Sequence, residues 1–475
     1  MKRIVAALGL TIASTSVGAA ADLPERIYTK TPAAQVYNWT GFYIGANAGV
    51  GLSRDPASVV IASTPAGGSS SVVGAVGAFG GGQIGYNWQT GNILFGVETD
   101  FQGAALQDDR TCTLTCMDFE ANRYDQHLDW FGTARGRIGL TTGSVLGYVT
   151  GGLAYGGVTT ANLVSVGAST TPFYWHQTRT GWTVGSGIEA ALPGNWTGKV
   201  EYLYLDLGSD RGILPLAGTG GVTSSIDYRQ HIVRVGVNYR FGRQQSGASE
   251  PPANWRGLYA GGNLGTLVGL NPSSSELSIF GLIASSDKYN LSPRGLIGGG
   301  QLGYNWQAGS VVVGLETDFQ GASAKGGGAC VLLCEPGVAA INADQRLNWL
   351  GTTRGRVGLA TGSALFYLTG GLAYGDVTTR VVQLFPFLPS SDNTFSHSRT
   401  GYAVGAGIET QFDPFGLFGH KWSAKTEYLY SDLGTVTDSF KVGPEAFAIT
   451  NTMTTHVQEH VFRTGLNYHF SDTSF

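Results

Sequence analysis

The alternation of charged and apolar residues along short, strand-like segments is the feature that most constrains the fold of this chain. In the stretch GNILFGVETDFQGA, Phe95 and Val97 would lie on one face of a β-strand, whereas Glu98 and Asp100 would lie on the other. A charge that is buried without a partner costs free energy, so these two carboxylates need counter-charges or water. The pattern therefore predicts a sheet with one apolar face and one ionic face.

Arginines on the following segment would meet these carboxylates across neighbouring strands. In LDWFGTARGRIGL, Arg135 and Arg137 share the polar face, and later segments add more charges to it. Charges inside and apolar residues outside reverse the arrangement of a soluble barrel, and a closed sheet satisfies its own backbone hydrogen bonds in lipid. We therefore expect an all-β, transmembrane, antiparallel β-barrel. The expected lumen ion network is Glu98, Asp100, Asp129, Arg135, Arg137, Arg179, Glu189, Lys199, Glu201, Arg234 and Arg240, with Glu316, Asp318, Arg354, Arg356, Arg399, Glu409, Lys425, Glu427 and Arg463 in the second half of the chain.

An internal duplication divides the chain into two halves. The stretch from Gly298 to Ala322 keeps 18 of the 25 residues found from Gly80 to Ala104, and further blocks match in the same order. Each half has eight strand-like segments joined by alternating short turns and long connections, a pattern typical of outer-membrane barrels. We expect two tandem eight-stranded barrels; one sixteen-stranded barrel, which would enclose an aqueous channel, is the alternative. The predicted halves are 38–242 and 254–475, joined by a polar linker over 243–253.

The first 21 residues have the pattern of a secretory signal peptide, with a basic pair at Lys2 and Arg3, an apolar run and small residues up to Ala21. Cleavage before Asp22 would leave a leader segment over 22–37. The apolar run is shorter than the roughly 20 residues that span a bilayer, which argues against a membrane anchor. Acidic residues outnumber basic ones and no basic patch stands out, so nucleic acid is not an expected partner.

The four cysteines form two matched pairs, Cys112 with Cys116 and Cys330 with Cys334. In an exported protein we expect each pair to form a local disulfide. A metal site is the alternative, although neither pair has a second ligand cluster at zinc-finger spacing. Such small rings would staple loops and leave the fold to the sheet.

No catalytic motif stands out. The chain has no Gly-x-Ser-x-Gly elbow, and the glycines of RGRIG and VGSGIE alternate along strands instead of preceding a helix as in phosphate loops. Six histidines are expected in loops or near loop ends: His127, His176, His231, His397, His456 and His460. We expect no enzyme and no metal or organic cofactor, with a lipid-modifying outer-membrane enzyme as a remote alternative.

The motifs NWTGFYIGANAGVG, GGGQIGYNW, GVETDFQG, RGRIG, TGGLAYG, EYLYLDLG and a closing VGVNYRF follow one another in this order after a signal ending in AADLP. This run resembles the small alpha-proteobacterial outer-membrane barrel proteins of the RopB-like type, often labelled porin-family or outer-membrane immunogenic proteins. The resemblance implies a Gram-negative outer-membrane location, an eight-stranded barrel and a surface-exposed antigen. The chain departs from that family by carrying two copies. Its final strand offers Phe470 or Phe475 as an aromatic insertion signal.

The expected role is structural, in membrane integrity and at the cell surface. Eight strands enclose a lumen that side chains can fill, so five acids and six bases in the first half predict a nearly neutral, salt-bridged plug; a porin-type channel for small hydrophilic solutes is the alternative. Expected partners are outer-membrane lipids and lipopolysaccharide, the barrel-insertion machinery and, through external loops such as the apolar stretch 381–398, a host or cell-surface ligand. Aromatic girdles at the lipid interfaces are expected to include Trp39, Trp88, Trp130, Trp255, Trp306 and Trp349.

Overall fold

The computed structural model describes residues 37–470 except for 54, 62–67, 74, 108–110, 118–119, 167–168, 215–221, 243–252, 327–328, 336–338, 385–390, 412–420 and 443–448. Within these residues the structure consists of β-strands, turns and short connections. No helix among them is long and apolar enough to cross a membrane. The all-β prediction is therefore confirmed.

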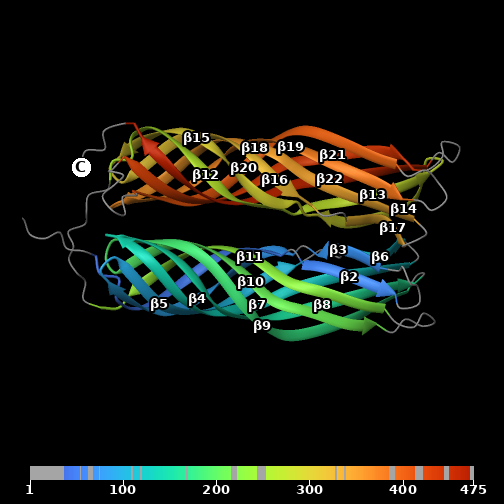
Figure 1. The fold of residues 1–475 in the computed structure, drawn as a ribbon, viewed down its shortest axis with the longest axis horizontal. Helices are drawn as coiled ribbons and strands as arrows, with labels where there is room; N and C mark the ends of the chain where they lie inside the picture. Colours follow the sequence, from blue (N-terminus) through green and yellow to red (C-terminus); the bar gives the residue numbers. More distant parts are fainter. Residues whose placement is uncertain are drawn as a thin grey trace, which may run out of the picture. The chain divides into compact units, whose positions relative to one another are not determined.

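The first half of the chain closes into a ring of eight antiparallel strands (Figure 1). The last wall strand pairs with the first, with Arg234 opposite Gly49, so the ring has no free edge along this stretch. One short strand pairs with the last wall strand, a second short strand pairs with the first one, and a third pairs with β7. The wall strands are β1 (Gly41–Ser53), β4 (Val76–Thr90), β5 (Ile93–Gln107), β7 (Glu120–Thr142), β8 (Val145–Val166), β9 (Ser169–Ala191), β10 (Trp196–Leu214) and β11 (Val222–Arg240), and the additional strands are β2 (Asp55–Ile61), β3 (Gly68–Val73) and β6 (Thr111–Met117).

The second half repeats this topology in a separate sheet, in which His469 on the last wall strand lies opposite Tyr259 on the first. The chain therefore folds as two tandem eight-stranded barrels, and the sixteen-stranded alternative is wrong because each half closes on itself. The wall strands are β12 (Gly257–Gly269), β15 (Arg294–Ala308), β16 (Val311–Lys325), β18 (Ala339–Thr361), β19 (Ala364–Leu384), β20 (Ser391–Gln411), β21 (Trp422–Lys441) and β22 (Ile449–His469), and the additional strands are β13 (Asn271–Ile279), β14 (Leu282–Leu291) and β17 (Ala329–Glu335).

The predicted alternation of short and long connections holds only in part, because the strands reach further into the expected long side and the connection between β20 and β21, expected on the short side, is longer than the one between β19 and β20. Only residues 167–168 separate β8 from β9. In the same way β19 continues to Leu384 and β20 begins at Ser391, so most of the expected external loop 381–398 is strand. On the other side, Gly91 and Gly143 turn the chain with φ of 60° and 59°, a left-handed conformation that glycine adopts without strain.

The outer wall near the short turns is apolar, as the alternation predicted. Phe95, Val97 and Phe101 point outward and are 49%, 50% and 55% exposed. Further along the strands the outward positions become charged, beginning with Asp206 opposite Arg229 in the first barrel. We call the apolar zone the apolar belt; it is the part of the wall that faces lipid, and these charged positions mark its outer edge.

Candidate functional site

The two carboxylates of β5 meet an arginine of β7 in the lumen. Glu98 lies opposite Arg135 in the strand pairing, and Asp100 lies opposite Thr133. The Nη2 atom of Arg135 donates to Glu98 Oε1 at 2.5 Å and to Asp100 Oδ2 at 3.0 Å. The Thr133 hydroxyl donates to Asp100 at 2.8 Å and accepts from Arg135 Nε at 2.8 Å. The carboxylates that the sequence placed on the ionic face therefore point into the barrel and find partners there.

Strands on the opposite wall complete this layer. Glu201 accepts hydrogen bonds from Arg135 Nη1 at 2.9 Å and from Arg234 Nε at 2.6 Å. Lys199 Nζ donates to both oxygens of Glu98 at 2.9 and 3.0 Å. Arg234 Nη2 also reaches Glu98 at 3.3 Å, although the two residues are 136 positions apart in the chain. Only closure of the sheet brings these charges together.

A second layer, nearer the short turns, is built around Arg137. Its Nη1 atom donates to Glu189 at 3.0 Å, and its Nε and Nη2 atoms donate to Asn87 Oδ1 at 3.0 and 2.8 Å. The guanidinium also lies 4.8 Å from the ring centre of Tyr43 and 5.2 Å from that of Tyr148, which adds cation–π attraction. The two tyrosine hydroxyls donate to glutamates of the first layer and so link the layers.

The second barrel repeats the network. Arg354 Nη2 contacts Glu316 at 2.8 Å and Asp318 at 3.0 Å, and Arg463 Nη2 contacts Asp318 at 2.8 Å. Each network contains four acids and four bases, so each is formally neutral. We use the term lumen ion network for Glu98, Asp100, Glu189 and Glu201 with Arg135, Arg137, Lys199 and Arg234, and for Glu316, Asp318, Glu409 and Glu427 with Arg354, Arg356, Lys425 and Arg463.

The network is sealed from solvent. The Arg135 side chain is 0% exposed and that of Glu98 is 3% exposed. Taking charges out of water is costly, and only close pairing with additional hydrogen bonds offsets that cost. Such a network fixes the register of the strands, because a shift of one residue would turn every charge on that strand outward.

The network expected from the sequence was limited to charged residues and left out its uncharged members. Tyr43, Asn87, Thr133 and Tyr148 are buried and bonded to its charged groups. The alternation of side chains could have identified them, because Thr133 lies two residues before Arg135 on the same strand and so faces the lumen as well.

An apolar plug, which was not predicted, fills the lumen on the side of the network away from the short turns. Leu203, Leu205 and Leu207 continue the inward face that begins with Lys199 and Glu201, and all three are buried. Inward-facing side chains from several wall strands pack with them. The apolar plug of the first barrel comprises Ala75, Phe79, Leu106, Leu128, Phe131, Ala154, Val158, Leu203, Leu205, Leu207, Ile226, Tyr228 and Ile232, and that of the second comprises Leu267, Ile297, Ala324, Leu347, Leu350, Ala373, Val377, Ala403, Leu429, Leu433, Val436, Val457 and Val461.

Two of the six expected girdle tryptophans instead close the turn end of the lumen. Trp39 is 0% exposed, packs against Leu94 and Leu146, and donates from Nε1 to the Gly143 carbonyl at 3.2 Å. Trp255 is likewise buried, in the second half. The girdle prediction was wrong for this pair, because both precede the first wall strand of their barrel. Trp88 and Trp306 do face outward, with 50% and 49% exposure.

The structure places Asp129 outside the network. A bulge between Leu128 and Trp130 shifts the register by one residue, so Asp129 is exposed and accepts a hydrogen bond from the Thr159 hydroxyl at 2.8 Å. The sequence prediction was wrong here because alternation was counted through the bulge.

Three predicted basic residues also lie away from the network. Arg179 pairs with Asp210 at 2.9 Å, and Arg399 donates to the Thr435 carbonyl at 2.8 Å. Arg240, at the turn end, donates to backbone carbonyls before β1 and lies 5.5 Å from the Trp39 ring. The assignment of all three residues to the network is therefore wrong. The alternation of side chains shows which face of the sheet a residue lies on, but not how far along the strand it lies, and these three lie too far along their strands to reach the acids of the network.

The predicted disulfides lie outside the described side chains: Cys112, Cys116, Cys330 and Cys334 are placed only as backbone of β6 and β17. Their pairing remains a prediction. The signal cleavage site between Ala21 and Asp22 and the terminal Phe475 are also outside the described residues.

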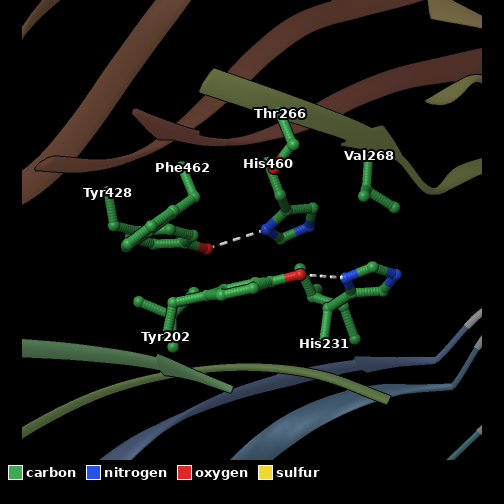
Figure 2. A pocket seen from close by; sticks show the side chains of 9 residues that line it. Tyr202, His231, Thr266, Val268, Tyr428, His460 and Phe462 are labelled. Carbon is green, nitrogen blue, oxygen red and sulfur yellow. Dashed lines mark hydrogen bonds between the residues drawn. The ribbon is translucent and has the colours of Figure 1, made fainter. Parts of the chain in front are cut away.

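The six histidines that were expected in loops or near loop ends all lie within strands. His231 Nδ1 and the Tyr202 hydroxyl are 2.7 Å apart, and His460 Nδ1 and the Tyr428 hydroxyl are also 2.7 Å apart (Figure 2). His397 contacts a carboxylate, that of Asp438, at 2.7 Å. Among the described residues, no three His, Cys, Asp or Glu side chains group in a way that could hold a metal ion.

Comparison with known proteins matches both halves of the chain. Residues 26–241 and 246–470 match the family described as outer membrane protein beta-barrel domain. The chain is 36% identical over 243 residues to a 31 kDa outer-membrane immunogenic protein of Brucella melitensis, which covers 50% of this chain and 98% of that protein. It is 31% identical over 163 residues to a 22 kDa outer membrane protein of Rhizobium leguminosarum bv. viciae, covering 34% of this chain and 66% of that protein. Among solved structures, Neisserial surface protein A matches with 17% identity and a TM-score of 0.21, covering 42% of this chain and 98% of that one.

Proposed function

Because the chain belongs to the outer membrane protein β-barrel domain family and carries that domain twice, we propose that it is a structural, surface-exposed protein of the outer membrane that does not conduct solutes. Its location in the outer membrane follows from the family. The proposed role is to add two closed barrels to the membrane and to present the outer ends of their strands at the cell surface.

The observation that carries the proposal is the filled lumen. In each barrel the neutral ion network crosses the interior, and the apolar plug lies on its outer side. An eight-stranded barrel is narrow enough for side chains to fill it. A porin-type channel needs a wet path along the axis, and the buried network occupies that path.

Surface exposure is supported by the length of the strands beyond the apolar belt. A Brucella relative is named an immunogenic protein, and we infer a similar antigenic surface for this chain. We further propose lipid and lipopolysaccharide as partners along the belt, the barrel-insertion machinery during assembly, and a host or cell-surface ligand at the outer strand ends. No catalytic role is proposed.

Planar-bilayer recording of the purified, reconstituted protein tests this function. We expect no large, stable conductance steps from the wild type. A Glu98→Ala and Arg135→Ala double variant removes the centre of one network and is expected to admit water and raise the leak. Arg229→Gln, at a partly exposed side chain outside the lumen, is the matched control. Porin-sized steps from the wild type would contradict the proposal.

A further inference from the structure

A polar layer interrupts the apolar plug of each barrel, and the two barrels build it differently. In the first barrel Asp55 is 0% exposed, and both of its oxygens are bonded. Gln126 Nε2 donates to Asp55 Oδ2 at 2.8 Å, and the backbone N–H of Arg229 donates to Oδ1 at 2.5 Å. This buried carboxylate is therefore fully partnered.

In the second barrel an amide takes the place of that carboxylate. Asn271 Oδ1 accepts from the backbone N–H of Gln458 at 2.7 Å, and Asn271 Nδ2 donates to Gln345 at 2.5 Å. These bonds reproduce those of Asp55 with Arg229 and Gln126. The carboxylate of this layer has moved to Glu459, at the position that Gln230 occupies in the first barrel.

Glu459 lies among apolar side chains. It is 1% exposed, and neither carboxylate oxygen has a hydrogen-bond partner among the described residues. In the strand pairing it lies opposite Gly269 on β12 and Ser431 on β21, and the Ser431 hydroxyl also has no partner within the described part of the chain. Its neighbours on the inner face of β22, Val457 and Val461, belong to the apolar plug.

Two further differences between the barrels make room for this carboxylate. Gly269 stands where the first barrel has Ser53, and Ser431 stands where it has Leu205. A Cβ atom on residue 269 would lie 2.8 Å from Glu459 Oε2, closer than carbon and oxygen normally approach. The glutamate, the glycine and the serine therefore form one matched set that the first barrel lacks.

No charge lies close enough to replace the missing partners. The inward-facing ionisable groups on β12, β21 and β22 are Tyr259, Lys425, Glu427, Asp438, Arg463 and His469, and on β16 and β18 the nearest are Asp318 and Arg354. The described contacts assign each of them another partner, in the lumen ion network or, for Asp438 and His469, in His397 and Ser423.

This layer lies outside the membrane-spanning segments. Arg294 and Asp432 face outward beside it and mark the edge of the apolar belt. Burial raises the pKa of the Glu459 carboxyl from 4.5 to about 8, and the nearby polar side chain of Asn271, which makes its hydrogen bonds to other groups, opposes this shift by less.

We propose that Glu459 is a proton-binding group that is neutral when the second barrel is closed, and that its ionisation loosens the apolar plug of that barrel. A carboxylate buried without a partner is unfavourable, so the folded state holds the proton more tightly than the unfolded state does. The contribution to stability is complete below the unfolded pKa and is lost as the pH rises through the folded pKa. The first barrel lacks this response because Gln230 does not titrate.

Amide hydrogen exchange of the full-length protein in detergent micelles, followed by mass spectrometry, tests the proposal. Wild type and Glu459→Gln are compared at pH 4, below the unfolded pKa, and at pH 9.5, so that the intrinsic effect of pH on exchange cancels within each pH. At pH 9.5 we expect peptides around 429–433 and 457–461 to exchange at least about tenfold faster in the wild type, because each pKa unit corresponds to a factor of ten and the pKa of Glu459 is raised by more than one unit. At pH 4 the two proteins should agree, and peptides around 203–207 and 228–232 should agree at both values.

Asp432→Asn, on the outer wall beside Glu459, is the control for a change of charge alone and should behave as the wild type. A second variant, Glu459→Gln with Ser431→Leu, rebuilds the pair of the first barrel and guards against a folding defect in the single variant. A wild type without the added exchange at pH 9.5 overturns the proposal. So does an equal difference between wild type and Glu459→Gln at both pH values, because that difference would report packing and not titration.

Discussion

Glu98 and Arg135 lie directly opposite each other on β5 and β7, and their side chains meet at 2.5 Å inside the lumen. The same relationship joins Glu316 to Arg354 at 2.8 Å in the second barrel. Two copies of one arrangement in a single chain allow each barrel to serve as the internal control for changes made in the other.

Replacing Arg135 by alanine should destabilise the first barrel strongly. The change removes one of the two arginines that Glu98, Asp100 and Glu201 share and leaves Arg234 as the other, and breaking a buried pair costs about 3–5 kcal/mol. Urea unfolding followed by the loss of heat-modifiable migration on gels measures the effect. Arg229→Ala, at a side chain that is 36% exposed, should change stability by less than about 0.5 kcal/mol. Equal effects of the two changes would remove Arg135 from the network.

Trp39→Ala should also lower the stability of the first barrel. The side chain is 0% exposed and closes the turn end of the lumen, and truncating a buried tryptophan costs about 3–5 kcal/mol. The same unfolding assay applies. Trp88→Ala provides the contrast, since that ring is 50% exposed on the outer wall and leaves no internal cavity. If Trp88→Ala were the more damaging change, Trp39 would not act as a core residue.

Cleavage of the linker should leave two folded barrels. The sheets close separately, so a protease that cuts between Gly242 and Ala253 is expected to release two fragments that each migrate faster before boiling than after it. Gel electrophoresis of the digested, detergent-solubilised protein measures this. Unfolding of either fragment on cleavage would mean that one half depends on the other.

The cysteines are expected to pair locally, Cys112 with Cys116 and Cys330 with Cys334. Mass spectrometry of non-reduced peptides identifies the pairs, and reduction should leave the heat-modifiable migration unchanged because the wall strands carry the fold. A disulfide between the two halves would contradict this prediction.

The alternation of side chains predicted the architecture because it reports on both faces of a sheet at once. It placed Glu98, Arg135, Lys199 and Glu201 inside, and the duplication correctly doubled the barrel. It failed at Asp129, where a bulge changes the parity without leaving a mark in the sequence pattern.

Alternation also says nothing about depth along the barrel axis. Leu203 has the same parity as Glu201, yet one belongs to the apolar plug and the other to the ion network. The strand register decides which inward residues share a layer, and that register depends on pairings between distant parts of the chain. Arg179 and Arg240 were assigned to the network for this reason, although they lie beyond it in opposite directions.

The long chain separation between partners in the network has a consequence for how the barrel enters the membrane. Glu98 is on the third wall strand and Arg234 is on the last, 136 residues later. A strand that entered the lipid alone would carry its charged side chains into the membrane without partners, and transferring each unpaired charge from water would cost several kcal/mol. Neutralisation becomes complete only when the last strand has joined the first. Insertion strand by strand is therefore disfavoured, and the charges inside each barrel make its assembly in the membrane an all-or-none event.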